Sequence, residues 1–294
     1  KISNWGLKSN FNALLKNVNT DSTNSTKYKD GADQSLLSSI LFSSEYPLKK
    51  TNDRYNDEMT PKVSFMYSPN KTKNMTAEER RIDINNIYSF NRIGVSDTVE
   101  GGASMTLGLK YKKINKNNFG KYINLEFANV LRHKKNEDLS IVSTLGETQS
   151  DFFGDLEIKP NKNFDMSYNF ALNNNLKQSN YDSIKTNFSL NNFATSFEYI
   201  DDKKSVGQKS YLANNTSIKI DDNGSVGFNL RRNNDTSATE FYDLYYSYAN
   251  DCLEAAITYN KSYYSDSDLE PETQLFLSVT IIPFGTVNSP DITN

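Results

Sequence analysis

The 294-residue sequence has little of the chemistry that most enzymes and metal sites use. It holds one cysteine, Cys252, and one histidine, His133, so no disulfide can form within the chain. Cysteine-based and histidine-rich metal sites are excluded for the same reason. A hydrolase with a Ser-His-Asp or Cys-His arrangement would have to be built around His133, which has no recognisable nucleophile motif near it. We therefore expect no enzyme activity, no metal and no cofactor.

The sequence also has no long apolar run and no strong excess of one charge. No stretch approaches the roughly 20 apolar residues of a membrane-spanning helix. A formal net charge of -3 gives no reason to expect nucleic acid as a partner. Mean hydropathy is low, at -0.69, yet 18 Tyr and 17 Phe argue against disorder. The 39 Asn residues disfavour helices, because Asn competes with the helix backbone for hydrogen bonds.

Strict alternation of apolar and polar residues is the pattern that recurs along the chain. Met105, Leu107 and Leu109 alternate with polar residues or glycine, which is the period of a half-buried strand. Similar runs occur at 123–127, 156–158, 164–172, 184–190, 193–199, 212–220, 226–230, 242–248, 253–259 and 275–281, and earlier at 7–15, 36–46 and 63–67. The pattern predicts about fourteen strands of roughly 9–12 residues.

The joints between these runs alternate in length along much of the chain. Short polar joints, typical of tight turns, occur at 161–163, 191–192, 221–224 and 250–251. Long charged joints occur at 16–33, 49–60, 70–100, 132–150 and 261–273. This asymmetry is typical of a meander whose two ends face different compartments.

Alternation alone fits either a soluble β-sandwich or an outer-membrane barrel. Tyr and Phe gather at the ends of the expected strands, where aromatic girdles of membrane barrels lie: Tyr111, Phe119, Tyr122, Phe152, Tyr199, Tyr211, Phe241, Tyr242, Tyr259, Tyr263 and Tyr264. The opposite faces keep charged and amide residues in mid-strand, as a wet lumen would require. We therefore predict an all-β, antiparallel, up-and-down transmembrane β-barrel.

Three ordered segments carry a resemblance to a known family. They are Ser89–Gly94 with Asp97 and Glu100–Gly102, then Asp138–Gly146, and finally Asn250–Glu254 with Leu269–Thr273 and a closing strand to Gly285. Together they resemble the C-terminal barrel region of the LptD family of outer-membrane lipopolysaccharide-assembly proteins. The resemblance spans about residues 5–285.

The resemblance implies a non-enzymatic translocon in the outer membrane of a Gram-negative bacterium. Members of the family insert lipopolysaccharide into the outer leaflet through a lateral seam of the barrel. The implied partners are lipopolysaccharide, an LptE-like plug lipoprotein, outer-membrane lipids and, through an N-terminal jellyroll domain, the periplasmic lipopolysaccharide-transport bridge. A general porin or transporter barrel is the alternative. We expect residues 1–286 to be the C-terminal part of a larger barrel, without the jellyroll and the first strands, and 287–294 to be a short polar tail.

The same resemblance assigns roles to the last strand and to the cysteine. It makes the final strand one lip of the lateral seam, with Leu275, Leu277, Val279, Ile281 and Pro283. Because Pro283 cannot donate a ladder hydrogen bond, it either weakens the seam or simply ends the strand. In the family, a cysteine at the position of Cys252 pairs with one near the N-terminus of the whole protein; the alternative is a free thiol.

A polar motif loop precedes the strand that begins near residue 103. It consists of Asn91, Arg92, Gly94, Asp97, Glu100, Gly101 and Gly102. Arg92 is expected to pair with Asp97 or Glu100 and to fold the loop over the lumen; the alternative is a structural turn that uses the freedom of the two glycines.

Two further groups of charged residues have two possible roles each, binding a ligand or contacting only solvent. The acidic groups Asp266, Asp268, Glu270 and Glu272, and Asp201 with Asp202, are either solvated or hold a divalent cation. The basic run of Arg132, His133, Lys134 and Lys135 either contacts lipid phosphate or is solvated.

Overall fold

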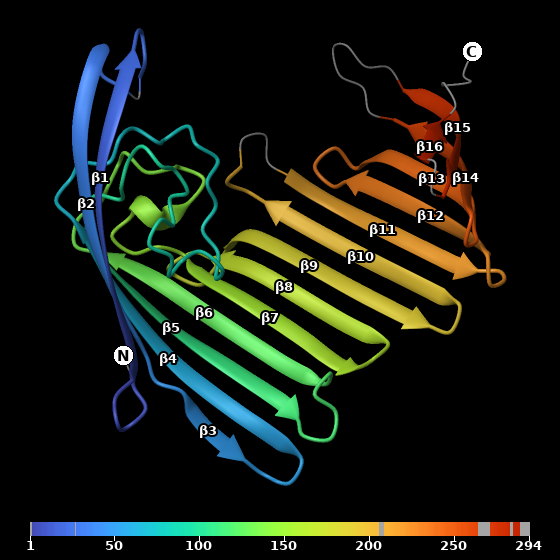
Figure 1. Ribbon diagram of the computed structural model, residues 1–294, viewed down its shortest axis with the longest axis horizontal. Helices are drawn as coiled ribbons and strands as arrows, with labels where there is room; N and C mark the ends of the chain where they lie inside the picture. Colours follow the sequence, from blue (N-terminus) through green and yellow to red (C-terminus); the bar gives the residue numbers. More distant parts are fainter. Residues whose placement is uncertain (1, 27, 206–208, 264–270, 283–284, 289–294) are drawn as a thin grey trace. The chain divides into compact units, whose positions relative to one another are not determined.

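The computed structural model describes residues 2–26, 28–205, 209–263, 271–282 and 285–288, with backbone only for the last of these ranges. These residues form sixteen strands and one 3-10 helix (Figure 1). Their bounds are β1 Lys8–Ser22, β2 Gly31–Glu45, β3 Leu48–Thr51, β4 Tyr55–Ser68, β5 Gly102–Asn115, β6 Tyr122–Arg132, η1 Thr144–Gly146, β7 Phe152–Asn161, β8 Phe164–Leu172, β9 Ser179–Leu190, β10 Phe193–Asp202, β11 Lys209–Lys219, β12 Gly224–Asn233, β13 Ala238–Ala249, β14 Leu253–Ser262, β15 Glu272–Ile281 and β16 Gly285–Asn288. Within the described ranges, no helix has the length and apolar character needed to cross a membrane.

The strands follow one another in chain order along one sheet, from β1 to β16. The exception is β3, which lies off this path and pairs with β4. The pairs are antiparallel, as between β5 and β6 or β13 and β14. This topology confirms the predicted all-β, up-and-down arrangement. The expected number of strands was too small by two, because the four-residue strands β3 and β16 show no alternation long enough to detect.

The joint expected at residues 49–60 is a further correction, since β3 and the first part of β4 occupy it. The cause is charge pairing across strands. Asp57 lies opposite Lys113 and Glu58 lies opposite Lys112 in the β4–β5 register. Opposite charges that face each other across a ladder stabilise a strand without any apolar alternation.

Two compact units divide the chain, and each is described by itself. The first contains residues 1–159, 168–182 and 202–207, and the second contains residues 160–167, 183–201 and 208–294. The first unit includes β1 to β6 and the two longest connecting loops. The second includes β11 to β16. The expected boundary between barrel and tail at residue 286 stays a prediction; β16 covers residues 285–288.

One face of the sheet in the first unit carries the exposed apolar side chains, and we call it the outer face. The cross-strand register places the large side chains of five strands in one row: Phe11, Phe42, Phe65, Met105 and Leu131. Leu107 is 42% exposed and Phe127 38% exposed on the same face. A row of large apolar groups directed away from the protein is what lipid requires of a barrel wall.

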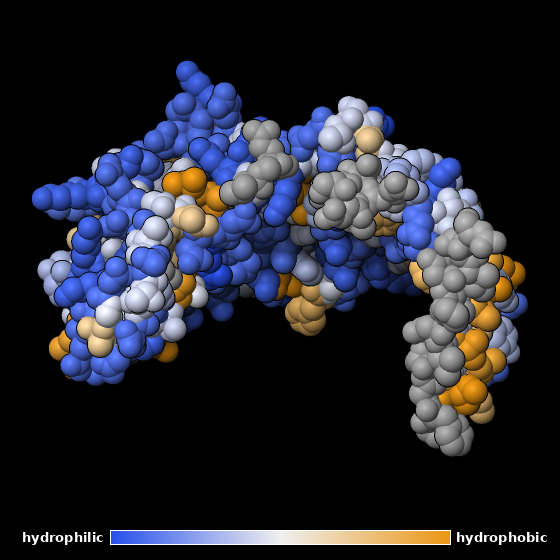
Figure 2. Space-filling view, turned by 90° about the horizontal axis from the view of Figure 1, so that it is seen from above, coloured by the Kyte–Doolittle hydropathy of each residue, from blue (hydrophilic) through white to orange (hydrophobic). Residues whose placement is uncertain are grey.

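The opposite face, the inner face, is polar and largely covered. Glu126 is buried on it and bonds to Lys62 at 2.5 Å and to Lys110 at 3.2 Å. Ser64 and Thr106 are buried beside these charged groups. Viewed from above Figure 1, the visible surface of the described residues is mostly hydrophilic, with separate hydrophobic patches (Figure 2).

Candidate functional site: the loop cluster and the two faces of the sheet

The two longest connections fold together over the inner face of the first unit. Residues 69–101 join β4 to β5 and residues 133–151 join β6 to β7; together they form what we call the loop cluster (Figure 1). Its apolar core combines both loops with inner-face side chains of β6 to β8: Met75, Ile82, Ile87, Ile93, Leu139, Leu145, Ala128, Val130, Phe153 and Ala171. The loops are therefore a packed element of the lumen side.

Backbone hydrogen bonds join the two loops to each other. The Met75 amide donates to the Asp138 carbonyl at 2.7 Å, and the Ser140 hydroxyl donates to the carbonyl of Glu78. At the base of the second loop, the Arg132 amide donates to the Thr148 carbonyl at 2.8 Å. These bonds satisfy backbone groups of both loops and join the loops to each other.

A buried charge network lies where the first loop enters β5. The Arg92 guanidinium contacts both oxygens of Glu100 at 2.6 Å, and donates to the Ser104 hydroxyl at 2.6 Å and the Thr106 hydroxyl at 3.0 Å. Arg132, from the end of β6, also contacts Glu100. All three charged side chains are almost completely buried. Of the two partners expected for Arg92, Glu100 is therefore the one in contact.

The network sets the charge of its single acid. Burial disfavours the Glu100 carboxylate, but the charges and hydrogen bonds of Arg92 and Arg132 outweigh this effect. The net result is a Glu100 pKa below the ordinary value. The two guanidinium groups therefore keep the Glu100 carboxylate ionised in spite of its burial.

The other motif residues shape the loop around this network. Asn91 donates its side-chain amide to the Val95 carbonyl at 2.7 Å, and Asp97 accepts from the Tyr28 hydroxyl at 2.5 Å. Gly94 has a φ of +76°. A methyl group on Gly101 would lie 2.3 Å from the Asn70 carbonyl oxygen, so only glycine fits there. Gly102 begins β5 with a φ of +85°.

A second ion pair joins the loop cluster to the wall strands of the same unit. Arg81 contacts Asp202, the last residue of β10, and its guanidinium lies 3.8 Å from the ring centroid of Tyr181 on β9. Burial lowers the Arg81 pKa, and Tyr181 is the largest of the opposing influences. The sequence offered no signal for this contact, because the partners lie in remote segments without a shared motif.

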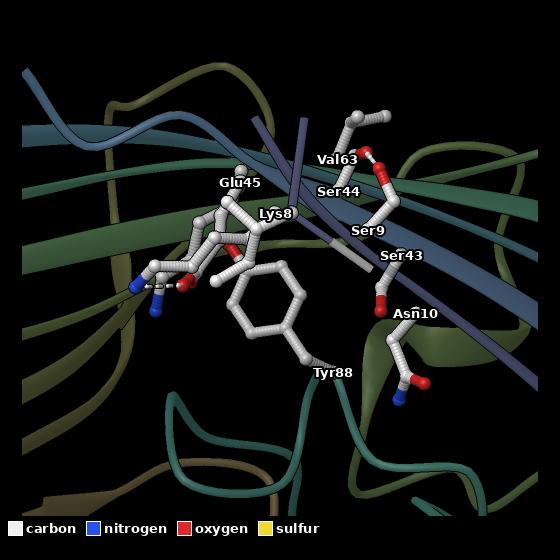
Figure 3. A pocket seen from close by; sticks show the side chains of 10 residues that line it. Lys8, Ser9, Asn10, Ser43, Ser44, Glu45, Val63 and Tyr88 are labelled. Carbon is white, nitrogen blue, oxygen red and sulfur yellow. Dashed lines mark hydrogen bonds and ion pairs between the residues drawn. The ribbon is translucent and has the colours of Figure 1, made fainter. Parts of the chain in front are cut away.

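A pocket of about 300 Å³ lies between the first residues of β1, the end of β2 and Tyr88 of the loop cluster (Figure 3). Lys8 pairs with Glu45 at 3.2 Å, and Ser9 and Ser44 share a hydrogen bond of 2.6 Å. Burial, and then the charge of Glu126, raises the Tyr88 pKa and keeps its hydroxyl neutral. The pocket offers hydroxyl, ammonium and carboxylate groups, which suit polar contacts with a ligand.

The inner face of the second unit carries a ladder of amide and carboxylate side chains. Asn215, Asn229, Asp243 and Asn260 lie opposite one another on β11 to β14. They join through bonds of 2.6 Å, 3.3 Å and 2.5 Å in that order. This ladder gives the Asn-rich composition a structural use, because each strand presents hydrogen-bonding groups to the inner side and apolar groups to the outer side.

The remaining expected site residues lie near the C-terminal end of the sheet. Leu275, Leu277, Val279 and Ile281 belong to β15, where each lies opposite an outward residue of β14, and Pro283 lies outside the described residues. The expected final strand is followed by β16, which pairs with Ser278–Ile281. Cys252 is an exposed free thiol in the turn before β14.

Metal-binding geometry is not found in the part of the chain that the structure describes, where no three His, Cys, Asp or Glu side chains gather. Asp202 pairs with Arg81. Asp266, Asp268 and Glu270 lie outside the described residues, as does Tyr264.

Sequence reasoning found part of the buried network. It named Arg92 and Glu100 but missed Arg132, Ser104 and Thr106 as their partners. The alternation could have indicated Ser104 and Thr106, because they lie on the polar face of the strand, opposite Met105 and Leu107. Arg132 was seen only as a member of the basic run.

Comparison with known proteins gives one family. The family model described as LptD, LPS transport system D, matches residues 11–238. No curated protein matches the sequence significantly.

Solved structures of outer-membrane barrels resemble the chain weakly. A mutant porin of Rh. blastica is 9% identical, with 96% of this chain and 92% of the porin covered and a TM-score of 0.39. A mutant ferric enterobactin receptor of Pseudomonas aeruginosa, in complex with enterobactin, is 9% identical, with 95% and 53% covered and a TM-score of 0.40. Such scores leave the family match as the basis for an assignment.

Proposed function

Because the chain belongs to the LptD family, whose proteins serve lipopolysaccharide transport in the bacterial outer membrane, we propose that it forms barrel wall through which lipopolysaccharide is inserted into the outer leaflet. The family match over residues 11–238 is the observation that carries this proposal. The role is one of passage without covalent chemistry. The two faces of the sheet support it, since the outer face suits lipid and the inner face suits a polar lumen.

The loop cluster fits this role as a fixed covering of the inner face. Its core packs on Ala128, Val130 and Phe153 of the wall, and its charges are held by Arg92 and Arg132. A lumen that carries a large amphipathic lipid must remain closed to small solutes when idle. We assign the closing role to the loop cluster, with the Arg92–Glu100 pair as its anchor.

The lateral seam is placed at β15 in this proposal. Leu275 is 46% exposed and Leu277 is 44% exposed, so the strand offers an apolar lip to acyl chains. In this proposal the second lip is the first strand of the whole barrel. Cys252 is exposed, as a disulfide with a remote cysteine of the whole protein requires. An LptE-like plug lipoprotein and the periplasmic transport bridge complete the proposed set of partners.

Depletion of the full-length protein in cells separates the proposal from its alternative. Loss of a lipopolysaccharide translocon lowers the lipopolysaccharide exposed at the cell surface, whereas loss of a porin slows the uptake of small solutes. Surface lipopolysaccharide is measured by its accessibility to an externally added modifying enzyme. Unchanged surface lipopolysaccharide together with slower solute uptake would favour the general porin.

The disulfide is tested on the full-length protein by electrophoresis with and without reductant. A shift in mobility that disappears in a Cys252→Ser variant is expected. Identical migration of the untreated and reduced wild-type protein would remove the disulfide from the proposal.

A further inference from the structure

Two adjoining pockets lie at the loop end of β4, β5 and β6, outside the loop cluster's core. The first is an apolar groove of about 460 Å³. Its floor and walls include Phe42, Phe65, Met105 and Leu131, which are in register across four strands. In the neighbouring row, Tyr67 lies opposite Ala103, whose short side chain leaves the groove open towards His133.

The second pocket is polar and continues the first. It measures about 540 Å³ and shares Ala103, Arg132 and His133 with the groove. Three exposed lysines line it, Lys71, Lys134 and Lys135, against the two acids Glu137 and Asp138, whereas the Arg132 guanidinium is buried against Glu100. The polar pocket therefore has an excess of positive charge where it meets the apolar groove.

Local ion pairs use only part of this positive charge. Lys71 contacts Asp138 at 3.6 Å and Lys135 contacts Glu147 at 3.2 Å, and all but Asp138 are at least half exposed. Exposed pairs of this kind are weak and exchange readily for another anion. Lys134 is exposed beside them. A phosphate group, with its charge and three acceptor oxygens, suits such a cluster.

The position of the two pockets decides what kind of ligand fits both. In outer-membrane barrels the longer loops are extracellular, so the loop end of β5 and β6 faces the outer leaflet. The groove then lies at the level of acyl chains, and the polar pocket at the level of headgroups. A pocket of about 540 Å³ is larger than a phosphate alone, so it has room for a sugar that carries the phosphate.

We propose that these two pockets form one site, on the outside of the wall, for a phosphorylated and acylated glycolipid. One acyl chain occupies the groove around Ala103, and a sugar phosphate occupies the basic pocket at His133–Lys135. The inference rests on the proposed function, which makes lipopolysaccharide the glycolipid. The site then holds lipopolysaccharide in the outer leaflet, against the outer face of β4 to β6.

Binding of defined lipids to the full-length protein, purified in detergent and followed by native mass spectrometry, tests the headgroup half. The probes are bisphosphorylated lipid A, its monophosphorylated form and phosphatidylglycerol. A Lys134→Gln/Lys135→Gln variant is expected to bind bisphosphorylated lipid A about tenfold more weakly, since each basic residue near an anionic lipid contributes appreciably. The matched control is Lys177→Gln, an exposed lysine in the β8–β9 loop at the same end of the strands.

An Ala103→Phe variant tests the groove half, because Ala103 is exposed and a larger side chain there fills the groove without entering a core. Its control is Ala255→Phe, on the outer face of β14. We expect Ala103→Phe to lower lipid A binding at least fivefold and Ala255→Phe to leave it unchanged. Wild-type binding by both groove and lysine variants, or equally tight binding of phosphatidylglycerol, would overturn the proposed site.

The outcome for this site is distinguishable from the outcome for the proposed function. If depletion leaves surface lipopolysaccharide unchanged while the variants still lose lipid A, the translocon proposal fails and the glycolipid site stands. If depletion lowers surface lipopolysaccharide while all variants bind lipid A as the wild type does, the site alone is wrong.

Discussion

Arg92 is a central member of the buried charge network of the loop cluster. When Arg92 is removed, Glu100 keeps Arg132 as its only guanidinium partner in the network. The removal of Arg92 takes away charged hydrogen bonds to Glu100, Ser104 and Thr106, each of which contributes about 1.5–3 kcal/mol. We expect Arg92→Ala to expose residues 69–101 to added protease in the folded full-length protein. Lys49→Ala, which removes the exposed pair with Glu58 at 3.4 Å, is the control and should change unfolding by less than about 1 kcal/mol. Equal protease resistance of both variants would show that Arg92 does not anchor the loops.

Glu100 gives the same network a defined dependence on pH. Its folded-state pKa lies below its ordinary value, so ionisation favours the folded loops above that ordinary value. The contribution is lost as the pH falls through the lowered folded pKa, that is, below about 4.3. We expect pepsin to cleave the loop cluster increasingly across that acidic range in the wild type. In Glu100→Gln the loops should be more accessible at every pH and lack this step. A step that persists in Glu100→Gln would show that Glu100 is not its cause.

At the scale of elements, Gly101 is the point where the loop cluster meets the sheet. Its backbone passes so close to Asn70 that a methyl group would lie 2.3 Å from the Asn70 carbonyl oxygen, and its amide donates to Thr72 at 2.8 Å. Gly101→Ala should therefore separate the two strand ends and lower the urea midpoint of unfolding of the full-length protein. The control is Gly120→Ala in the β5–β6 turn, where the nearest atom is a movable Asn118 oxygen at 3.2 Å. If Gly101→Ala lowered the urea midpoint less than Gly120→Ala does, the close approach of Gly101 to the Asn70 carbonyl would be contradicted.

The sequence predicted the elements whose pattern is local and missed those that depend on remote partners. Alternation found β5 and β6 because residues 105–111 and 123–127 alternate with a period of two. It missed β3 and the start of β4, where charges opposite Lys112 and Lys113 replace apolar residues. The two loops of the loop cluster were correctly expected not to be strands, whereas residues 16–22 and 31–33 of the joint expected at 16–33 belong to β1 and β2. The core of the loop cluster was not foreseen. Met75 and Ile87 follow no period, and their partners Leu139 and Leu145 belong to the other loop.

For the whole molecule, the assignment of an outer lipid face and an inner polar face makes opposite predictions for neighbouring residues of one strand. Phe127 lies on the outer face of β6, whereas Asn124 lies on the inner face near Glu157, to which it donates at 3.4 Å. Phe127→Arg places a charge in the hydrocarbon region and should cost about 2–4 kcal/mol. Asn124→Arg places the same charge on the polar inner face, between Glu157 and Lys112, and should be tolerated because the carboxylate and water compensate it.

The measurement that separates these two variants is the folded fraction of the full-length protein in outer membranes, determined from the heat-dependent mobility of the barrel in electrophoresis. Phe127→Arg should lower the folded fraction strongly, because its charge would contact lipid. Asn124→Arg should leave the folded fraction near that of the wild type, because its charge lies on the inner face. If the two variants fold equally well, β6 does not separate lipid from lumen. The transmembrane orientation that underlies both the proposed passage of lipopolysaccharide and the glycolipid site would then be wrong.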